Sequence, residues 1–81
     1  MQHRAMPRSH HSLPYKKLRA ALLKARLDAA MTQAQVAARV KRPQSFVSKY
    51  ESGERQLDVV EFVGVCKAIG VLPVDVMALL Q

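Results

Sequence analysis

The chain has 81 residues, of which 49% are hydrophobic and 5% aromatic, and its formal net charge is +7. This length suits one small domain with a single core and excludes a separate catalytic domain. No apolar run approaches the roughly 18 residues of a membrane-spanning helix, and the polar N-terminus lacks a signal-peptide core, so we expect a cytoplasmic protein without a membrane partner.

Charge is distributed unevenly along the chain. Residues 1–50 hold eleven Lys and Arg against one acid, a net +10, whereas residues 51–81 hold two against five, a net −3. A basic half beside a mildly acidic half is typical of a protein that places one side against a polyanion and keeps the other for itself or a partner. Charge alone does not separate DNA from RNA or a membrane surface.

Residues 1–13 combine Pro, Ser, His and Arg without an apolar period. This composition predicts a disordered, basic N-terminal arm ahead of a domain over residues 14–81. Arg4 and Arg8 would suit a DNA minor groove, and a solvated tail is the alternative. The three histidines of the arm have no second cluster of ligands nearby, so we expect no metal site, and no other cofactor is indicated.

The first helix is predicted to begin at Pro14, whose missing N–H costs nothing in a first turn, and to run to about Ala29. Its inner stripe consists of Leu18, Leu22, Ala25 and Ala29. Its basic residues flank that stripe or point to solvent: Lys16, Lys17, Arg19 and Lys24.

A second, short helix is predicted after Thr32, which is its expected N-cap. Its apolar residues form one narrow stripe: Val36, Ala37 and Val40. Only Lys41-Arg42-Pro43 separates this helix from the next, so the chain must turn a corner there.

The third helical pattern lies between Pro43 and Gly53 and has two distinct faces. Val47 and Tyr50 are three residues apart and share the apolar face. Two helices joined this tightly cross steeply, with a small residue, Ala37, at their contact, and this is helix-turn-helix geometry. The opposite face of the third helix is polar and rich in hydrogen-bonding groups: Gln44, Ser45, Ser48 and Lys49.

Two further helices are predicted in the C-terminal part. Asp58 and Glu61 have the spacing of a capping box at the start of a fourth helix, and Gly70 supplies its left-handed stop. Pro73 opens a last helix that runs to Leu80. The expected fold is therefore all-α, with five helices and no strand. The residues of the fourth helix expected to face the core are Val59, Phe62, Val65, Cys66 and Ile69.

The helix pair and its closing turn carry a recognisable set of residues: Gln33, Ala37, Val40, Val47, Tyr50 and Glu51-Ser52-Gly53. Together they resemble the DNA-binding domain of phage repressors, the Cro and lambda-repressor-like (Xre-type) family. The resemblance extends from about Tyr15 to Leu80. It implies a compact five-helix domain in which the second and third helices form the helix-turn-helix. Ala30 and Lys41 stand where relatives commonly carry Gly.

The resemblance also implies how double-stranded DNA is bound, with the third helix in the major groove and its N-terminal residues against base edges. Gln can pair with adenine, Lys can donate to guanine, and Ser can serve a base or a phosphate. By the same resemblance, Arg26 pairs with Glu51 and ties the third helix to its support. The expected base-reading residues are Gln44, Ser45, Ser48 and Lys49. The expected phosphate-binding residues are Gln33, Lys41, Arg42 and Arg55.

The function implied is that of a sequence-specific transcriptional regulator, expected to be a repressor that binds a palindromic operator as a homodimer. The apolar residues crowded into the last helix predict an exposed patch where two copies meet. A fully buried closing helix is the alternative. The expected interface residues are Val76, Leu79 and Leu80.

A rival interpretation belongs to a different class of protein. It is an antitoxin-like interaction module that neutralises a partner protein and autoregulates its own operon. The observation that favours the regulator is that nothing beyond Gln81 is left to wrap such a partner. An enzyme is not expected, because the predicted helices contain no nucleophile with a matching base, no Gly-rich phosphate loop and no catalytic carboxylate pair.

Overall fold

The computed structural model describes residues 12–81, which form five α-helices without a strand. This confirms the predicted all-α fold. Of the predicted disordered arm, residues 1–13, all but Ser12 and Leu13 lie outside the described residues. The Ser12 hydroxyl accepts a hydrogen bond from the Tyr15 N–H and caps the first helix. The helices are α1 (Leu13–Asp28), α2 (Gln33–Val40), α3 (Gln44–Ser52), α4 (Val59–Ile69) and α5 (Pro73–Ala78).

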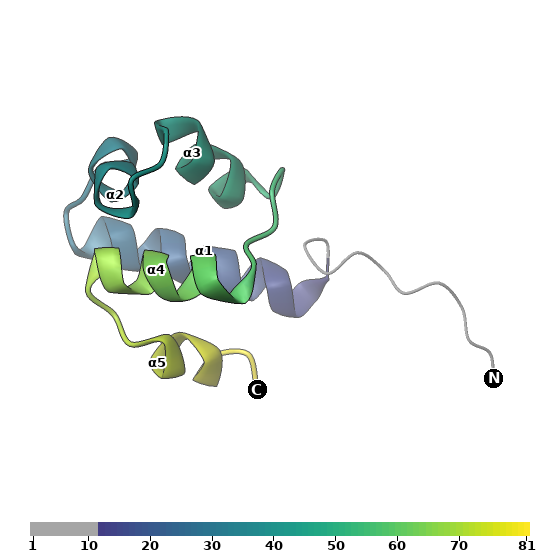
Figure 1. Cartoon of the computed structure of the whole chain (residues 1–81). Coiled ribbons are helices and arrows are strands. Elements are labelled where there is room, and N and C mark those ends of the chain that lie inside the picture. Colours follow the sequence, from purple (N-terminus) through teal and green to yellow (C-terminus); the bar gives the residue numbers. More distant parts are fainter. Residues whose placement is uncertain (1–11) are drawn as a thin grey trace.

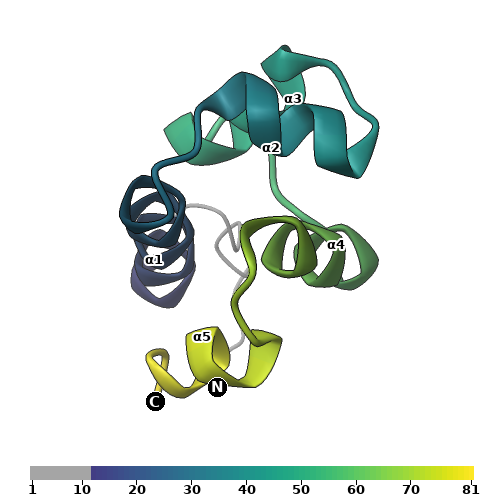
Figure 2. The same cartoon turned by 90° about the vertical axis from the view of Figure 1, so that its left-hand side faces the viewer.

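The helices are arranged in three levels (Figure 1). α2 and α3 lie together above α1 and α4, and α5 lies below α1 and α4 on the side away from α2 and α3 (Figure 2). α2 contacts α3 and α4, whereas α5 contacts α1 and α4. α3 is therefore left with one face open, at the end of the molecule opposite α5. No helix in this part of the chain is long and apolar enough to cross a membrane.

Reciprocal side-chain caps fix where two of the helices begin. The Thr32 hydroxyl accepts a hydrogen bond from the Gln35 N–H (3.1 Å), and the Gln35 side-chain oxygen accepts one from the Thr32 N–H (2.8 Å). Asp58 and Glu61 make the same reciprocal pair at the start of α4. Both predicted N-caps are confirmed, and each pair satisfies two N–H groups that a helix start otherwise leaves unpaired.

The largest fully buried side chains lie where the four longer helices meet: Leu22, Val36, Val47, Tyr50, Val65 and Cys66. Val47 and Tyr50 thus face inward, as predicted. Burial raises the pKa of the Cys66 thiol, which keeps it neutral and in the role of a small apolar core residue. Phe46, which the helical spacing did not assign to the core, is also buried and sets its ring edge against Tyr50, with 5.6 Å between ring centroids.

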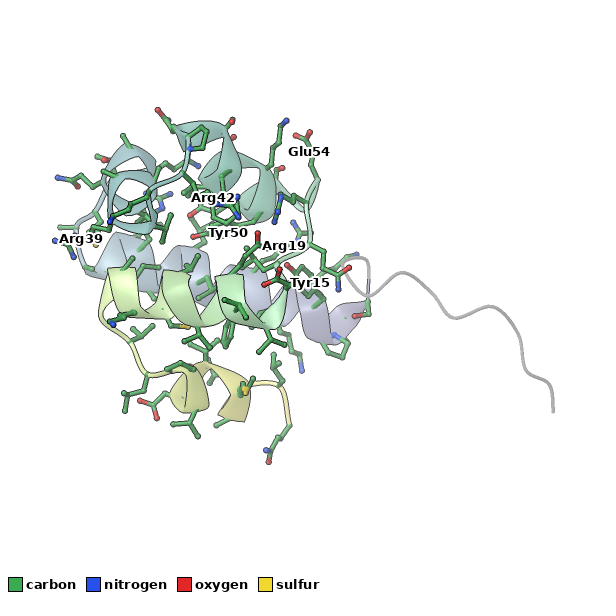
Figure 3. All side chains as sticks on the ribbon, in the orientation of Figure 1. Tyr15, Arg19, Arg39, Arg42, Tyr50 and Glu54 are labelled. Carbon is green, nitrogen blue, oxygen red and sulfur yellow. The ribbon has the colours of Figure 1, made fainter. Side chains whose placement is uncertain are left out.

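Two residues predicted to face inward are exposed instead. Val59, the first residue of α4, is 71% exposed, and Ala29 is the exposed C-cap of α1. Both predictions were wrong because the helical spacing was extended to the ends of the helices, where a side chain on the inner stripe no longer faces a neighbouring element. Tyr15 closes the core near Val59, and its hydroxyl accepts a hydrogen bond from the Leu57 N–H at 2.9 Å (Figure 3).

The last helix departs from the prediction in length and in orientation. α5 ends at Ala78 rather than at Leu80. Val76 is only 5% exposed and packs into the core, so its assignment to a dimer interface is wrong. Leu79 is 60% exposed, and Leu80 is half-buried.

Two turns place residues other than glycine in the left-handed conformation. Ala30 has a φ of 57° and Lys41 a φ of 59°, and these are the two positions where the resembled family commonly carries Gly. At Lys41 the turn ends α2, because the N–H groups of Lys41 and Arg42 donate to the carbonyls of Ala38 and Ala37. A side chain in this conformation costs roughly 1 kcal/mol.

We expect Lys41→Gly to raise the free energy of unfolding by up to about 1 kcal/mol, because glycine adopts a left-handed backbone without a steric penalty. The control is Ala38→Gly, at an exposed position inside α2, which should lower the same quantity by about 1 kcal/mol. Urea unfolding of both variants measures the two changes. A Lys41→Gly chain that is no more stable than the wild type contradicts the proposed strain.

Candidate nucleic-acid interface

A buried ion pair between Arg26 and Glu51 joins α1 to the end of α3. The Arg26 Nε donates to one oxygen of the Glu51 carboxylate at 2.7 Å, and its Nη2 donates to the other at 3.0 Å. The two side chains are 11% and 6% exposed. The hydrogen bonds that Arg26 donates to Glu51 are the main cause of the raised pKa of Arg26, so the guanidinium stays charged although it is buried. The structure thus brings together the two residues whose pairing the family resemblance implied.

Further contacts surround this pair. The Arg26 Nη1 donates to the Met31 carbonyl at 2.9 Å, which attaches the α1–α2 turn to the same guanidinium. Arg19, expected to point outward or flank the apolar stripe, lies instead across the end of α3 and donates to the Glu51 carbonyl at 3.3 Å (Figure 3). Gly53 has a φ of 88°, and a Cβ built on it would lie 2.6 Å from an Arg19 nitrogen. Glycine at this position therefore allows the left-handed backbone that ends α3 and leaves room for the Arg19 side chain.

A chain of side-chain amides extends the ion pair to the start of α3. The Gln33 Nε2, at the first position of α2, donates to the Glu51 carboxylate at 2.8 Å. The Gln33 Oε1 accepts from the Gln44 Nε2 at 3.4 Å. The sequence assigned Gln33 to phosphate and Gln44 to a base edge, and the structure links the two directly. Gln44 is thus connected by hydrogen bonds through Gln33 to the buried pair of Arg26 and Glu51.

The outer face of α3 has the polar character that its sequence predicts. Phe46, Val47 and Tyr50 are buried, and burial raises the pKa of the Tyr50 phenol above its ordinary value, so this residue remains neutral. The predicted base-reading residues are all exposed: Gln44, Ser45, Ser48 and Lys49. They form one hydrogen-bonding surface on a helix whose other side is fixed in the core. Such a surface can donate to and accept from base edges.

Two of the predicted phosphate-binding residues are held by an acid on α4. Arg42 donates a hydrogen bond to the Glu61 carboxylate at 2.7 Å. Arg55 donates two more to the same carboxylate, one from each terminal nitrogen, at 2.8 Å each. Both guanidinium groups also lie over the Phe46 ring, at 4.4 and 5.0 Å from its centroid. Arg55 is the largest cause of a Glu61 pKa near 2, and Glu61 in turn raises the pKa of Arg55.

Sequence reasoning found Glu61 only as a helix cap and missed its pairing with the two arginines. The pairing joins the α2–α3 turn, the α3–α4 link and the first turn of α4. The only available signal was that a basic turn, Lys41-Arg42, and a basic residue of the link, Arg55, both come before the acid of this capping box. Lys41, the remaining predicted phosphate-binding residue, is exposed at the corner between α2 and α3.

An exposed apolar surface covers the other end of the domain. It includes residues of α5 and of the outer side of α4: Val59, Val60, Val63, Leu72, Val74, Met77 and Leu79. Within residues 12–81 no three His, Cys, Asp or Glu side chains are grouped so that they could hold a metal. The histidines considered in the sequence, at positions 3, 10 and 11, lie outside the described residues.

Comparison with known proteins supplies relatives for this architecture. The model of a family described as a helix-turn-helix domain matches residues 17–80. The solved structure of an XRE-family like protein from Pseudomonas syringae pv. tomato str. DC3000 is 47% identical, with a TM-score of 0.83 over 89% of this chain and 88% of that one. The clp gene regulator ClgR from C. glutamicum is 26% identical, with a TM-score of 0.77 over 86% of this chain and 91% of its own.

A third structure shows only the likeness of fold. It is the restriction-modification controller protein C.Esp1396I, solved as a tetramer with its natural 35 base-pair operator, and it is 24% identical to this chain. Its TM-score is 0.78 over 86% of this chain and 92% of its own. A comparison with curated proteins gives no match.

We expect Glu51→Ala to lower the free energy of unfolding by about 3–5 kcal/mol, because it leaves the buried Arg26 charge without its partner. Urea unfolding of Glu51→Ala, Arg26→Ala and the double variant measures the coupling, and the double variant should lose less than the sum of the single losses. The control is Asp28→Ala, which removes an exposed ion pair with Lys24 and should cost less than about 1 kcal/mol. Strictly additive losses contradict the coupling of Arg26 and Glu51.

Proposed function

The chain belongs to the XRE-type helix-turn-helix family of DNA-binding regulators, and from this we propose that it is a transcriptional repressor that binds a palindromic operator as a homodimer. The observation that carries the proposal is the exposed polar face of α3 on a helix that buried contacts hold in place. A repressor of this kind acts by occupying a promoter, so the proposal assigns the chain no catalytic step and no cofactor.

Gln44 is proposed as the principal base reader. One N–H of its side chain donates to Gln33. Its second N–H and its oxygen make no further hydrogen bond among the described residues, and these two groups match adenine N7 and N6. Because Gln33 is itself fixed by Glu51, the Gln44 amide is oriented before DNA arrives, which reduces the entropy lost on binding.

The cations around α3 are proposed to differ in how freely they reach phosphate. Lys41 is exposed at the turn. The Arg42 side chain is 41% exposed and commits one nitrogen to Glu61, so most of its donors remain for a phosphate. Arg55 commits both terminal nitrogens to Glu61 and is the weakest of the three candidates. The N-terminus of α2, at Gln33, offers N–H groups and a favourable dipole for another phosphate.

Dimerisation is proposed to use the apolar residues of α5 and the outer side of α4. Leu79 is 60% exposed, and its neighbours Met77 and Val74 are 46% and 65% exposed. A surface of this kind on a small domain favours association with a second copy. A two-fold dimer with recognition helices about 34–36 Å apart, one turn of DNA, requires a palindromic site.

Selection of bound duplexes from a random DNA library tests the proposed function directly. A palindromic consensus with half-sites separated by about one helical turn is the expected outcome. Recovery of duplexes without a shared sequence, at an affinity that depends only on salt, contradicts sequence-specific repression.

We expect Gln44→Ala and Lys49→Ala each to weaken binding to the selected duplex by about 1–3 kcal/mol and to lose preference for it over a scrambled duplex, because each removes a base contact. Arg42→Ala is the matched comparison. It should weaken both duplexes about equally and make the salt dependence shallower. Titration of each variant at several salt concentrations gives these values. Equal losses on the two duplexes for Gln44→Ala and Lys49→Ala contradict their role as base readers.

We expect Leu79→Glu to convert a dimer into a monomer. In a two-fold contact the same residue of each copy lies in the interface, so the substitution places two negative charges close together on an apolar surface. Leu27→Glu is the control, since Leu27 on α1 is also 60% exposed but lies outside the proposed interface. Sedimentation measures both variants against the wild type. A wild type that is monomeric at high micromolar concentration, or a Leu79→Glu chain that still dimerises, contradicts the interface.

A further inference from the structure

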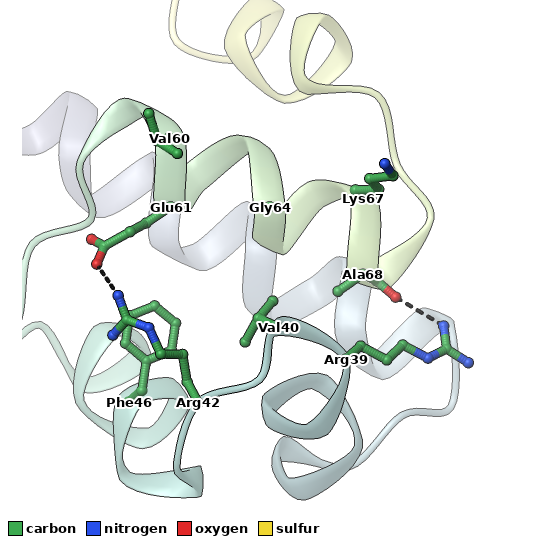
Figure 4. A pocket seen from close by; sticks show the side chains of 9 residues that line it. All are labelled: Arg39, Val40, Arg42, Phe46, Val60, Glu61, Gly64, Lys67 and Ala68. Carbon is green, nitrogen blue, oxygen red and sulfur yellow. Dashed lines mark hydrogen bonds and ion pairs between the residues drawn. The ribbon is translucent and has the colours of Figure 1, made fainter.

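A groove of about 520 Å³ runs between the α2–α3 pair and α4. Its two ends differ from its middle (Figure 4). Arg42, Phe46 and Glu61 form one end, Arg39 and Lys67 form the other, and apolar or small residues lie between them. None of the four predicted base-reading residues lines this groove, so it is separate from the exposed face of α3.

The groove carries a surplus of positive charge. Three of its lining residues are cations, Arg39, Arg42 and Lys67, and the only acid is Glu61. Glu61 is already shared between Arg42 and Arg55. Arg39 binds an uncharged group, the Ala68 carbonyl, at 2.9 Å, and Lys67 forms no ion pair with any residue from 12 to 81. Arg39 and Lys67 therefore bring two positive charges without an acidic partner to this end of the groove, with their side chains extending in different directions (Figure 4).

The middle of the groove is apolar and kept open by a glycine. Val40 and Gly64 lie between the charged ends, whereas Val60 lies near Glu61 at one end of the groove and is 80% exposed (Figure 4). A Cβ added to Gly64 would meet nothing within 4 Å. Packing therefore does not require glycine at this position inside α4, where glycine weakens a helix relative to alanine. A missing side chain here preserves space in the groove at a cost in helix stability.

A DNA phosphate is a poor match for this combination. Phosphodiester groups would satisfy the cations but would leave Val40 and Val60 against a charged, hydrated backbone. A segment that carries both carboxylates and an apolar side chain satisfies the two kinds of surface together. Open grooves between helices are a common site for such peptide segments.

We propose that this groove binds an acidic segment of a partner protein, with one apolar side chain over Val40 and Gly64 and adjacent carboxylates on Arg39 and Lys67. The proposal goes beyond DNA recognition and does not depend on it. Charge complementarity favours such an occupant because the groove has two cations that no acid of the described chain neutralises.

A second copy of the chain is a less suitable occupant. Asp75 and its exposed apolar neighbours on α5 have the right chemistry, but α5 lies on the opposite side of α4 from α2 (Figures 1 and 2). Docking α5 of one copy into the groove of the next would join unlike surfaces, which gives a ring or an open chain unless the contact is made in both directions. A two-fold contact through α5 leaves the groove free apart from its rim at Val60, which also belongs to the exposed apolar surface of α4.

The test is a titration of the full chain with a short synthetic peptide that has two adjacent aspartates followed by leucine and phenylalanine, observed through backbone amide chemical shifts. The matched peptide has asparagine in place of each aspartate. We expect saturable shifts at Val40, Gly64 and Lys67 with the acidic peptide, and binding at least about tenfold weaker with the neutral one, as the loss of a complementary charge pair implies.

Variants of the chain separate this groove from general attraction to a basic protein. Lys67→Glu should weaken the acidic peptide at least about tenfold, because it places like charges together, whereas Lys16→Glu, an equal charge change on an exposed residue of α1, should have little effect. Gly64→Leu should block the peptide by filling the groove. Gly64→Ala reports on the fold, since it should raise the melting temperature.

Three results would overturn the proposal. The first is equal weakening by Lys67→Glu and Lys16→Glu, which indicates attraction by net charge alone. The second is a set of shifts centred on Gln44 and Lys49, which places the peptide on the face of α3. The third is self-association of the wild type that Lys67→Glu abolishes and Leu79→Glu does not, which assigns the groove to a second copy.

Discussion

The buried contact between Arg26 and Glu51 is the constraint on which the arrangement of this domain depends. Taking two charges out of water costs several kcal/mol per ion, and only good geometry offsets that cost. Here the geometry is bidentate, at 2.7 and 3.0 Å. Because Arg26 lies on α1 and Glu51 near the end of α3, the pair fixes how α3 sits on the rest of the domain. Gln33 adds α2 to the same contact, so three helices share one polar centre.

This centre connects the core of the protein to its surface. The Gln33 side chain has one end on Glu51 and the other on Gln44, which is the first residue of α3. The buried pair of Arg26 and Glu51 thereby helps to position Gln44, whose side chain faces solvent. The cationic residues nearby also fall into two groups, those paired with an acid and those exposed to solvent. Arg42 and Arg55 brace the turn and the link through Glu61, while Lys41 and Lys49 remain exposed.

Local signals in the sequence predicted much of this fold and the exposed polar face of α3. Thr32 and Asp58 indicate where α2 and α4 begin, because a capping box involves only residues three positions apart. The spacing of Val47 and Tyr50 alone indicates the inner face of α3. The pairing of Glu61 with Arg42 joins residues 19 positions apart, and no local pattern encodes which acid meets which base. Val76 was misplaced for a related reason. In a six-residue helix with apolar residues on every side, spacing does not show which one points inward.

A structure of the chain bound to its selected duplex tests the central claim, that a buried polar centre presents α3 to DNA as a preformed reading surface. The account predicts α3 in the major groove with the Gln44 amide against a base edge. It also predicts that the contacts among Arg26, Glu51 and Gln33 are the same as in the free chain. An α3 that lies outside the groove, or an Arg26–Glu51 pair that opens when DNA binds, would contradict it.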